Sequence, residues 1–443
     1  MTLLCKHDRL GRTAGAFSVL AALSLAAHPV QAQAPANVLF ASELPTSANA
    51  NTGAVLTFDL ATGAPLTPFL TSGTTSDKGL AYYSPDGGTT NNYFVSQGTG
   101  VITERDTNAR VQKTFGTSGQ FANLNSINLD GAGNVYTTSP SGGGGTLNGK
   151  IGVFLRGADS TGFGTYTASY GLTAQLSGTS LTVQSAAVNA ASSTSGTVNG
   201  ATVGATGTAP LLQGNTYVST ATTSNTLNGT GIAFTATLPT TAANQNLAVS
   251  QVGSNVTAAN QSVFFNNAFY FAGSTVTLDP ANNTSTLING IFSTNGASLT
   301  PFITFTNVYK GAGGPGGKTQ GSTAGDISFS APTGLAFVGN SVFVEDFVTT
   351  KLASGNNQAS TNIYKYSLAG GAPTLDTTFG GGNGFISVVN AGAAGTTNNA
   401  PFNVGSALLV APVPEPSQAA ALGLGVLGLT GLILRARRTP LVA

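Results

Sequence analysis

The sequence predicts an all-β fold built from repeated antiparallel units. Only 7% of the 443 residues are charged, and 59 residues are glycine. Glu, Lys and Arg are therefore too scarce for long solvent-exposed helices, whereas abundant Gly and Asn are typical of tight turns between strands. A chain of this length can form one large β fold or two ordinary domains. Besides the low charge and the many turn-forming residues, strand-like segments recur along the chain.

The same pair of segments occurs near both ends of the chain. Residues 37–43 (NVLFASE) precede residues 53–65, which include VLTFDLATGAP. Residues 341–347 (SVFVEDF) similarly precede residues 361–373, which include IYKYSLAGGAP. The second members of the two pairs align without a gap, so we expect them to be equivalent strands of two repeats.

A second recurring element is a tight turn between two apolar strands. Asp-Gly or Gly-Asn dipeptides occupy this turn in residues 79–88, 125–134 and 334–340. Each repeat then has three or four antiparallel strands in about 40–55 residues, and it must stack on its neighbours to bury both faces. The pattern resembles NHL-type and related bacterial propeller repeats, which implies a β-propeller-like body of about 6–8 blades. A β-sandwich and a β-solenoid are the competing architectures.

The body has three parts by composition. Residues 33–159 and 263–410 carry the propeller-like repeats, whereas residues 160–262 contain no charged side chain and are rich in Ser, Thr, Asn and Gly. This middle part still shows short alternating segments, so it is either an inserted β segment or a set of divergent blades. Disorder is the alternative for residues 185–225.

The N-terminal residues have the pattern of an export signal. Basic residues precede an uncharged apolar run at 14–27, and Ala32 then precedes Gln33. The run has the length of a signal-peptide core, and small residues at the −3 and −1 positions favour cleavage. We therefore expect residues 1–32 to form a signal peptide that is cut between Ala32 and Gln33. The alternative is an uncleaved N-terminal anchor.

The C-terminal residues 411–443 contain three elements in a defined order. These are the motif Val413-Pro414-Glu415-Pro416, the apolar run 419–434, and the basic residues Arg435, Arg437 and Arg438. The apolar run is at the short end of the range for a transmembrane helix. The arginines would stay on the cytoplasmic side and stop translocation.

This tail resembles the PEP-CTERM sorting signal of Gram-negative bacteria that make exopolysaccharide. In that family an exosortase, a multi-pass membrane enzyme, recognises the Pro-Glu-Pro motif and removes the tail. The resemblance implies an inner-membrane intermediate, processing by an exosortase, delivery to the cell envelope or the medium, and association with exopolysaccharide. A plain tail anchor is the alternative.

The residue types of the body exclude several chemistries. His7, His28 and Cys5 are the only histidines and cysteine, and all three precede the expected cleavage site. The mature chain would therefore lack Ser-His-Asp and Cys-His catalysis, and metal sites built on imidazole or thiolate. Acidic residues also outnumber basic ones in the body, so no basic surface for nucleic acid is expected.

The candidate functional residues are carboxylates, although none forms a strong motif. Glu345 and Asp346 are adjacent, and neighbouring side chains on a strand point to opposite faces, so these two cannot form a catalytic pair. Glu43 falls at a similar place in its repeat and could share a central channel with one of them. Such a channel could bind Ca²⁺. Asp130, in residues 128–134, and Asp86 fit Asx-stabilised hairpin turns better than calcium loops.

Three functions remain open from the sequence. The leading hypothesis is a non-enzymatic envelope or extracellular-matrix scaffold, without a cofactor, that associates with exopolysaccharide. The second is a propeller lyase or hydrolase that uses channel carboxylates and Ca²⁺. The third is an adhesin-like structural β-protein.

Overall fold

The computed structural model describes the body of the chain and leaves both ends undescribed. The described residues are 37–43, 53–74, 77–86, 90–97, 99–121, 124, 126–139, 145–158, 161–188, 196–198, 201–203, 211–219, 229–237, 244–248, 256–266, 268–279, 284–294, 298–310, 327–351, 357–389 and 407–412. The signal-peptide residues Ala32 and Gln33, the motif 413–416 and the three C-terminal arginines lie outside these ranges. In the described part no helix is long and apolar enough to cross a membrane, and residues 419–434 fall outside that part.

The described strands form antiparallel meanders, which we call blades and number in chain order. Blade 1 contains β27 (Leu408–Pro412), β1 (Asn37–Glu43), β2 (Gly53–Asp59) and β3 (Leu70–Thr74), in that spatial order. Blade 2 contains β4 (Asp77–Ser84), β5 (Asn92–Gln97), β6 (Ile102–Arg105) and β7 (Val111–Phe115). Blade 3 contains β8 (Ser126–Leu129), β9 (Val135–Thr138), β10 (Ile151–Ala158) and β11 (Gly164–Leu176).

The later blades repeat this arrangement. Blade 4 contains β12 (Thr179–Val188), β15 (Leu211–Ser219) and β16 (Gly229–Thr237), and β12 also pairs briefly with β11 of blade 3. Blade 5 contains β18 (Val256–Phe265), β19 (Ala268–Asp279), β20 (Thr284–Thr294) and β21 (Leu299–Lys310). Blade 6 contains β22 (Ile327–Val338), β23 (Ser341–Lys351) and β24 (Asn357–Ser367), with β25 (Thr374–Leu375) and β26 (Phe385–Val389) both paired to β24.

Smaller elements are attached to these blades. A hairpin of β13 (Gly196–Val198) and β14 (Ala201–Val203) extends blade 2 beside β4. Strand β17 (Gln245–Ala248) pairs in parallel with β11. The short helix α2 (Phe379–Gly382) precedes β26. The charge-free residues 160–262 therefore contribute blade 4, these small strands and parts of the adjoining blades.

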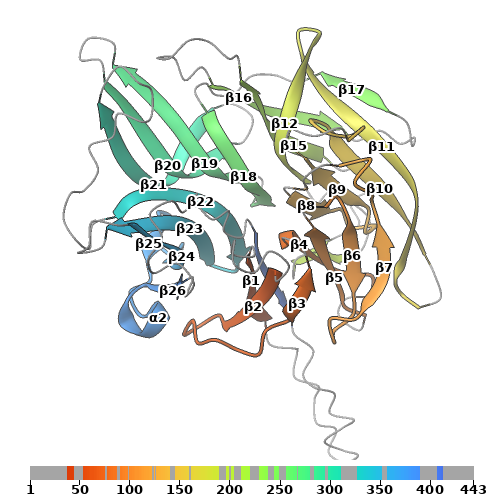
Figure 1. Ribbon diagram of the computed structural model, residues 1–443, viewed down its shortest axis with the longest axis horizontal. Helices are drawn as coiled ribbons and strands as arrows, with labels where there is room; N and C mark the ends of the chain where they lie inside the picture. Colours follow the sequence, from red (N-terminus) through yellow and green to blue (C-terminus); the bar gives the residue numbers. More distant parts are fainter. Residues whose placement is uncertain are drawn as a thin grey trace, which may run out of the picture. The chain divides into compact units, whose positions relative to one another are not determined.

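The innermost strands pack in a cyclic order. Strand β27 contacts β4, β4 contacts β8, and β8 contacts β12. Strand β12 then contacts β18, β18 contacts β22, and β22 returns to β27. Figure 1 shows the labelled blades arranged about a common centre in this sequence. The all-β prediction is confirmed, and this packing order is propeller-like.

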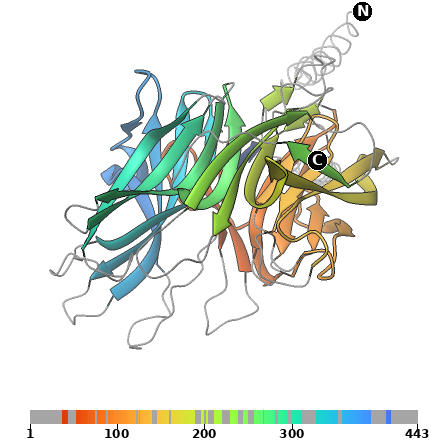
Figure 2. The same ribbon diagram turned by 90° about the horizontal axis from the view of Figure 1, so that it is seen from above.

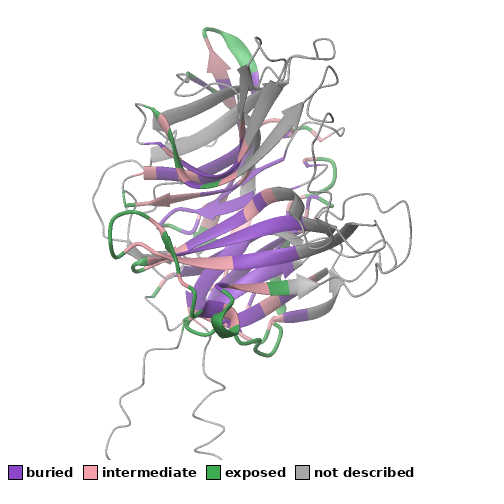
Figure 3. Ribbon diagram, turned by 90° about the vertical axis from the view of Figure 1, so that its left-hand side faces the viewer, coloured by how far each residue is buried: buried purple, intermediate pink, exposed green. Residues whose placement is uncertain are grey.

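Burial on both faces explains the apolar character of the strands. In β5 the side chains of Tyr93 and Val95 pack with blade 1, whereas Phe94 between them packs with blade 3. Sheets covered on both faces need nearly continuous apolar runs instead of strict alternation. Figure 3 accordingly shows buried residues along the strands, and exposed residues in turns and around α2. Figure 2 shows blades 5 and 6, in green to blue, side by side.

The repeat alignment correctly placed equivalent strands. Strand β2 is the third strand of blade 1, counted from β27, and β24 is the third strand of blade 6. The turn prediction for Asp130 is also confirmed, because its Oδ1 accepts hydrogen bonds from the N–H groups of Ala132 and Asn134. Its Oδ2 accepts from the Asn134 amide and the Tyr136 hydroxyl. The turn itself therefore occupies both oxygens of this carboxylate.

Candidate functional site

The acidic pair predicted from the sequence lies in the interior of blade 6. Glu345 and Asp346 are both on β23 and are each 1% exposed. The flanking Phe343 packs towards blade 1 and Val344 packs towards blade 5. By alternation Glu345 faces the blade 1 side and Asp346 the blade 5 side. As expected, the two carboxylates do not face each other.

Glu345 lies beside a buried glutamine that the sequence analysis did not identify. A Cβ added to Gly334 would be 2.7 Å from Glu345 Oε2 and 3.2 Å from Gln261 Oε1, so the two side chains converge on this glycine. Gln261 Oε1 accepts hydrogen bonds from the N–H of Leu335 (2.9 Å) and of Leu408 (2.8 Å). Its Nε2 donates to the carbonyl oxygen of Leu408 at 2.8 Å. One side chain on blade 5 thus joins blade 6 to blade 1.

Other polar side chains on the innermost strands also join neighbouring blades. Asn128 of blade 3 donates to the carbonyl oxygen of Ala186 in blade 4 at 2.7 Å. Ser185 of blade 4 shares a hydrogen bond with Ser262 of blade 5. Buried polar groups of this kind must be hydrogen-bonded to be tolerated, and here they satisfy one another across blades. Gln261, Asn128 and the Ser185–Ser262 pair therefore join neighbouring blades. Glu43 ends β1, and its side chain lies outside the described part.

A second group of buried polar side chains lies between blades 2 and 3. Glu104 is fully buried and accepts a hydrogen bond from the N–H of Gly164 at 3.0 Å. The Arg156 guanidinium lies 5.1 Å from the centre of the Tyr83 ring. Burial raises the pKa of Tyr166 far above its ordinary value. Burial therefore favours the protonated phenol of Tyr166.

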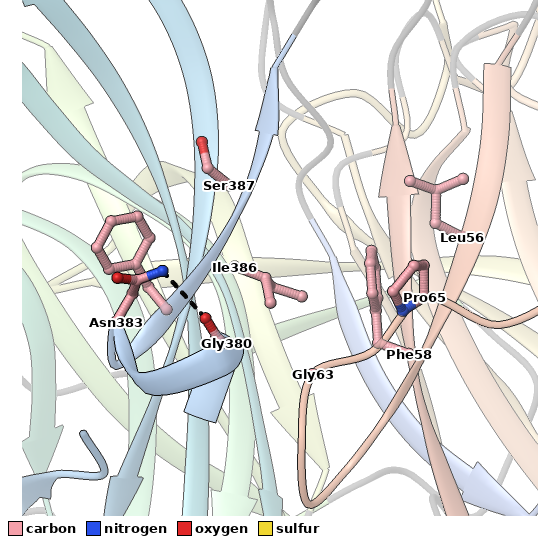
Figure 4. Close-up of a pocket in the computed structure, with 9 residues that line it drawn as sticks. Leu56, Phe58, Gly63, Pro65, Gly380, Asn383, Ile386 and Ser387 are labelled. Atoms are coloured by element: carbon pink, nitrogen blue, oxygen red, sulfur yellow. Dashed lines mark hydrogen bonds between the residues drawn. The ribbon is translucent and has the colours of Figure 1, made fainter. Parts of the chain in front are cut away.

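A groove opens where blade 6 meets blade 1, with a volume of about 500 Å³. Its lining consists of Leu56, Phe58, Gly63, Pro65, Gly380, Asn383, Phe385, Ile386 and Ser387. Figure 4 shows Phe58 and Pro65 on one side and Ile386 on the other, with Gly63 between them. The walls are apolar, and an amide and a hydroxyl are the polar side chains in the lining. None of these residue types is ionisable near neutral pH.

The two sides of the groove are held together by a close backbone contact. Gly63 has φ of +74°, and a Cβ there would lie 2.7 Å from Ile386 Cγ2. The N–H of Gly380 donates to the carbonyl oxygen of Thr62 at 2.9 Å. The turn after β2 therefore docks onto α2, and glycine is required because both the left-handed backbone and the space exclude a side chain.

Charged groups beside the groove belong to turns. Asp59 accepts hydrogen bonds from the hydroxyl and the N–H of Thr62 (each 2.7 Å), and the hydroxyl bond above all holds the pKa of Asp59 below its ordinary value. Asp376 likewise accepts a hydrogen bond from the Thr378 hydroxyl, which lowers its pKa, and it pairs with Lys365 at 3.2 Å. Within the described ranges, no three His, Cys, Asp or Glu side chains gather as metal ligands.

Comparisons with known proteins show no family. No family model matches the chain, and no curated protein matches it. Three solved structures cover much of it at 10% identity. The first is described as a 6-phosphogluconolactonase from Bacteroides fragilis; the match covers 86% of this chain and 99% of that one, with a TM-score of 0.36. The second is a periplasmic gluconolactonase from Pseudomonas aeruginosa, with coverages of 85% and 99% and a TM-score of 0.28. The third is a lignostilbene dioxygenase from Pseudomonas brassicacearum, with coverages of 78% and 65% and a TM-score of 0.22. TM-scores this low carry no argument about the fold or the activity of this chain.

Proposed function

We propose that this chain is an exported envelope or extracellular-matrix protein whose body binds exopolysaccharide and has no enzymatic activity. The signal peptide 1–32 would direct export, and the tail 411–443 would hold an inner-membrane intermediate until an exosortase removes it. The body would then remain on the cell surface or pass into the medium. Six blades closed into a ring would form the scaffold, and residues 160–262 would supply divergent blades within it.

The composition of the groove between blades 6 and 1 supports binding over catalysis. Its walls offer the ring of the half-buried Phe385, and its polar side chains are those of Asn383 and Ser387. A sugar ring has apolar C–H faces and hydroxyl edges, so aromatic rings with a few polar groups suit it. General acid–base catalysis needs a titratable group within hydrogen-bonding reach of the substrate, and the lining supplies none.

A second line of support comes from the carboxylates. Asp130 and Asp59 accept hydrogen bonds within their own turns, and Glu345 and Asp346 face opposite sides of their strand. The lyase or hydrolase alternative requires several carboxylates that converge in a channel with Ca²⁺. No observation in the described part of the chain favours that arrangement over a scaffold.

A variant that fills the groove tests the proposal. Ser387 is exposed on β26, so Ser387→Trp places an indole in the groove without removing a buried group. Full-length wild type and variant are produced in an exosortase-carrying host, and the fraction of released protein that sediments with the purified exopolysaccharide is measured. We expect that fraction to fall by about tenfold, since loss of one stacking site of ~1.4 kcal/mol changes affinity tenfold.

The matched control is Ser180→Trp, which adds the same side chain at an exposed position on β12. This control should sediment like the wild type. Equal sedimentation of wild type and Ser387→Trp would show that the groove is not the binding site. A wild type that never sediments with the polysaccharide would overturn the proposed ligand.

A further inference from the structure

The first and last described strands are neighbours. Strand β27 pairs antiparallel with β1, from Ala41 opposite Leu408 to Asn37 opposite Pro412. The predicted signal cleavage after Ala32 lies a few residues before this pair, and Val413 follows it directly. Along the chain, both predicted processing sites therefore lie within a few residues of this strand pair.

Strand β27 is buried on both faces. Leu408 and Val410 pack in the cluster shared with blade 6, and Leu409 and Ala411 pack in the cluster shared with blade 2. All four residues are at most 4% exposed. At the start of the strand, Gln261 hydrogen-bonds both the N–H and the carbonyl oxygen of Leu408.

The last residue of β27 is held as well. The Tyr93 hydroxyl on β5 donates a hydrogen bond of 2.5 Å to the carbonyl oxygen of Pro412. Tyr93 is 2% exposed, and burial raises its pKa above the ordinary value, so the hydroxyl keeps the proton that it donates. The backbone is thus fixed up to the residue immediately before the motif 413–416.

The fixed position of the Pro412 end of β27 would hinder cleavage of the tail by a protease. A protease binds several residues in extended form on each side of the bond that it cuts, and folded segments are cut through transient opening. Six residues separate Pro412 from the apolar run at 419, and at about 3.5 Å per residue they span at most about 25 Å. While β27 is fully paired, the residues that precede the motif are held in blade 1, so a membrane enzyme could not bind them in its own cleft.

We propose that β27 is a gate on tail processing: the Pro412 end must detach from β1 and from Tyr93 before the membrane enzyme can bind the motif. This inference rests on the proposed sorting function. The gate adds no chemistry to the cleavage. It sets the fraction of time during which the motif is available, and after cleavage β27 closes the ring again.

A disulfide lock tests the gate in the full-length chain. Asn37→Cys combined with Pro412→Cys places two cysteines at directly opposed positions, a spacing suited to a disulfide. The remaining cysteine, Cys5, precedes the expected signal cleavage site, and the periplasm is oxidising. In an exosortase-carrying host, pulse-chase should show release slowed by about tenfold or more, with recovery on adding a reductant.

Two further variants make the test specific. A six-residue Gly/Ser spacer between Pro412 and Val413 in the locked chain should restore release, because the motif then extends beyond the locked strand. Tyr93→Phe keeps the ring and removes its hydrogen bond to Pro412, so release should accelerate by about two- to tenfold. Each single-cysteine variant should be released like the wild type.

The outcomes separate the gate from the sorting function. If replacement of Pro414-Glu415-Pro416 by alanines leaves release unchanged, the sorting function is wrong and the gate falls with it. If release depends on the motif but the locked, spaced and Tyr93→Phe variants are all released at the wild-type rate, the gate alone is wrong. The Tyr93→Phe result decides the matter even if the disulfide variant fails to fold.

Discussion

The junction between blades 2 and 3 and the junction between blades 6 and 1 are stabilised differently. At the first, Phe115 stacks on Tyr166 with ring centres 4.0 Å apart, and Phe115 also contacts Phe154 edge-on. At the second, Phe58 and Leu408 of blade 1 pack in one apolar cluster with Phe343 of blade 6. Gln261 and the backbone bond from Gly380 to Thr62 add hydrogen bonds there. A groove remains open there.

The difference follows from chain connectivity. Blades 2 and 3 are consecutive in sequence, so closing the loop between them loses little entropy, and stacked rings with the Glu104–Gly164 hydrogen bond hold them together. Blades 6 and 1 come from opposite ends of the body. Their contact combines an apolar cluster with the directional hydrogen bonds of Gln261, and pairing of β27 with β1 removes a sheet edge that would otherwise be exposed. We therefore expect changes at the 6–1 junction to act on the whole ring.

Removing β27 should have the largest effect. Burial of Leu408, Leu409 and Val410 contributes about 6 kcal/mol at ~2 kcal/mol for each side chain, which is comparable to the whole stability of a domain. We expect residues 33–406 to lose cooperative folding, whereas residues 33–412 retain it. Thermal unfolding followed by circular dichroism compares the two. An open solenoid would instead melt within a few degrees of the longer form, because its stability is a sum over neighbours.

Gln261→Leu should have the next largest effect. The change leaves the N–H of Leu335 and both backbone groups of Leu408 without their partner, at about 1 kcal/mol or more for each buried group. We expect a loss of about 3 kcal/mol in the free energy of unfolding, measured with urea. Gln112→Leu is the control, because this exposed amide donates to the half-buried Asp106 and should change stability by less than about 1 kcal/mol. Equal losses in the two variants would contradict a special role for Gln261.

Substitutions at two glycines distinguish the free-energy cost of a steric clash at the 6–1 junction from the cost of backbone strain. Gly63 and Gly178 both have positive φ, of +74° and +83°, but a Cβ would meet Ile386 at Gly63 and nothing within 4 Å at Gly178. Gly178→Ala should lose about 1 kcal/mol from strain alone, and Gly63→Ala about 2 kcal/mol. Urea denaturation gives both values. If they coincide, the turn after β2 does not dock tightly on blade 6.

The smallest effect concerns the Asp59 carboxylate in the same turn. The Thr62 hydroxyl above all lowers the pKa of Asp59 in the folded chain. The carboxylate therefore stabilises the fold at pH values above its pKa in the unfolded chain. This stabilisation is lost as the pH falls through its lower pKa in the folded chain. Thr62→Val should raise the pKa of Asp59 towards the ordinary value. NMR titration of the carboxyl carbon measures this. Thr378→Val, which alters the equivalent bond to Asp376, should leave Asp59 unchanged.

The local elements were predictable because their causes are local. Asp-Gly and Gly-Asn turns, apolar runs and the alignment of residues 53–65 with 361–373 follow from neighbouring residues, and the structure places β2 and β24 at equivalent positions. The opposite orientation of Glu345 and Asp346 follows from strand geometry alone. Nothing local distinguishes Gln261 from the many other polar residues of the charge-poor segments.

The sequence by itself determined an all-β body made of repeats and the carboxylates of its turns, and it predicts the export and sorting signals. The tertiary structure decided which strands close the ring, which polar side chains join the blades and where a groove remains. The physical reason is distance along the chain. Gln261 and Leu408 are 147 residues apart, and Tyr93 and Pro412 are 319 apart. These partners come together only when the assembled ring buries them. A buried polar group without a hydrogen bond costs free energy there, and no local sequence pattern identifies its partner.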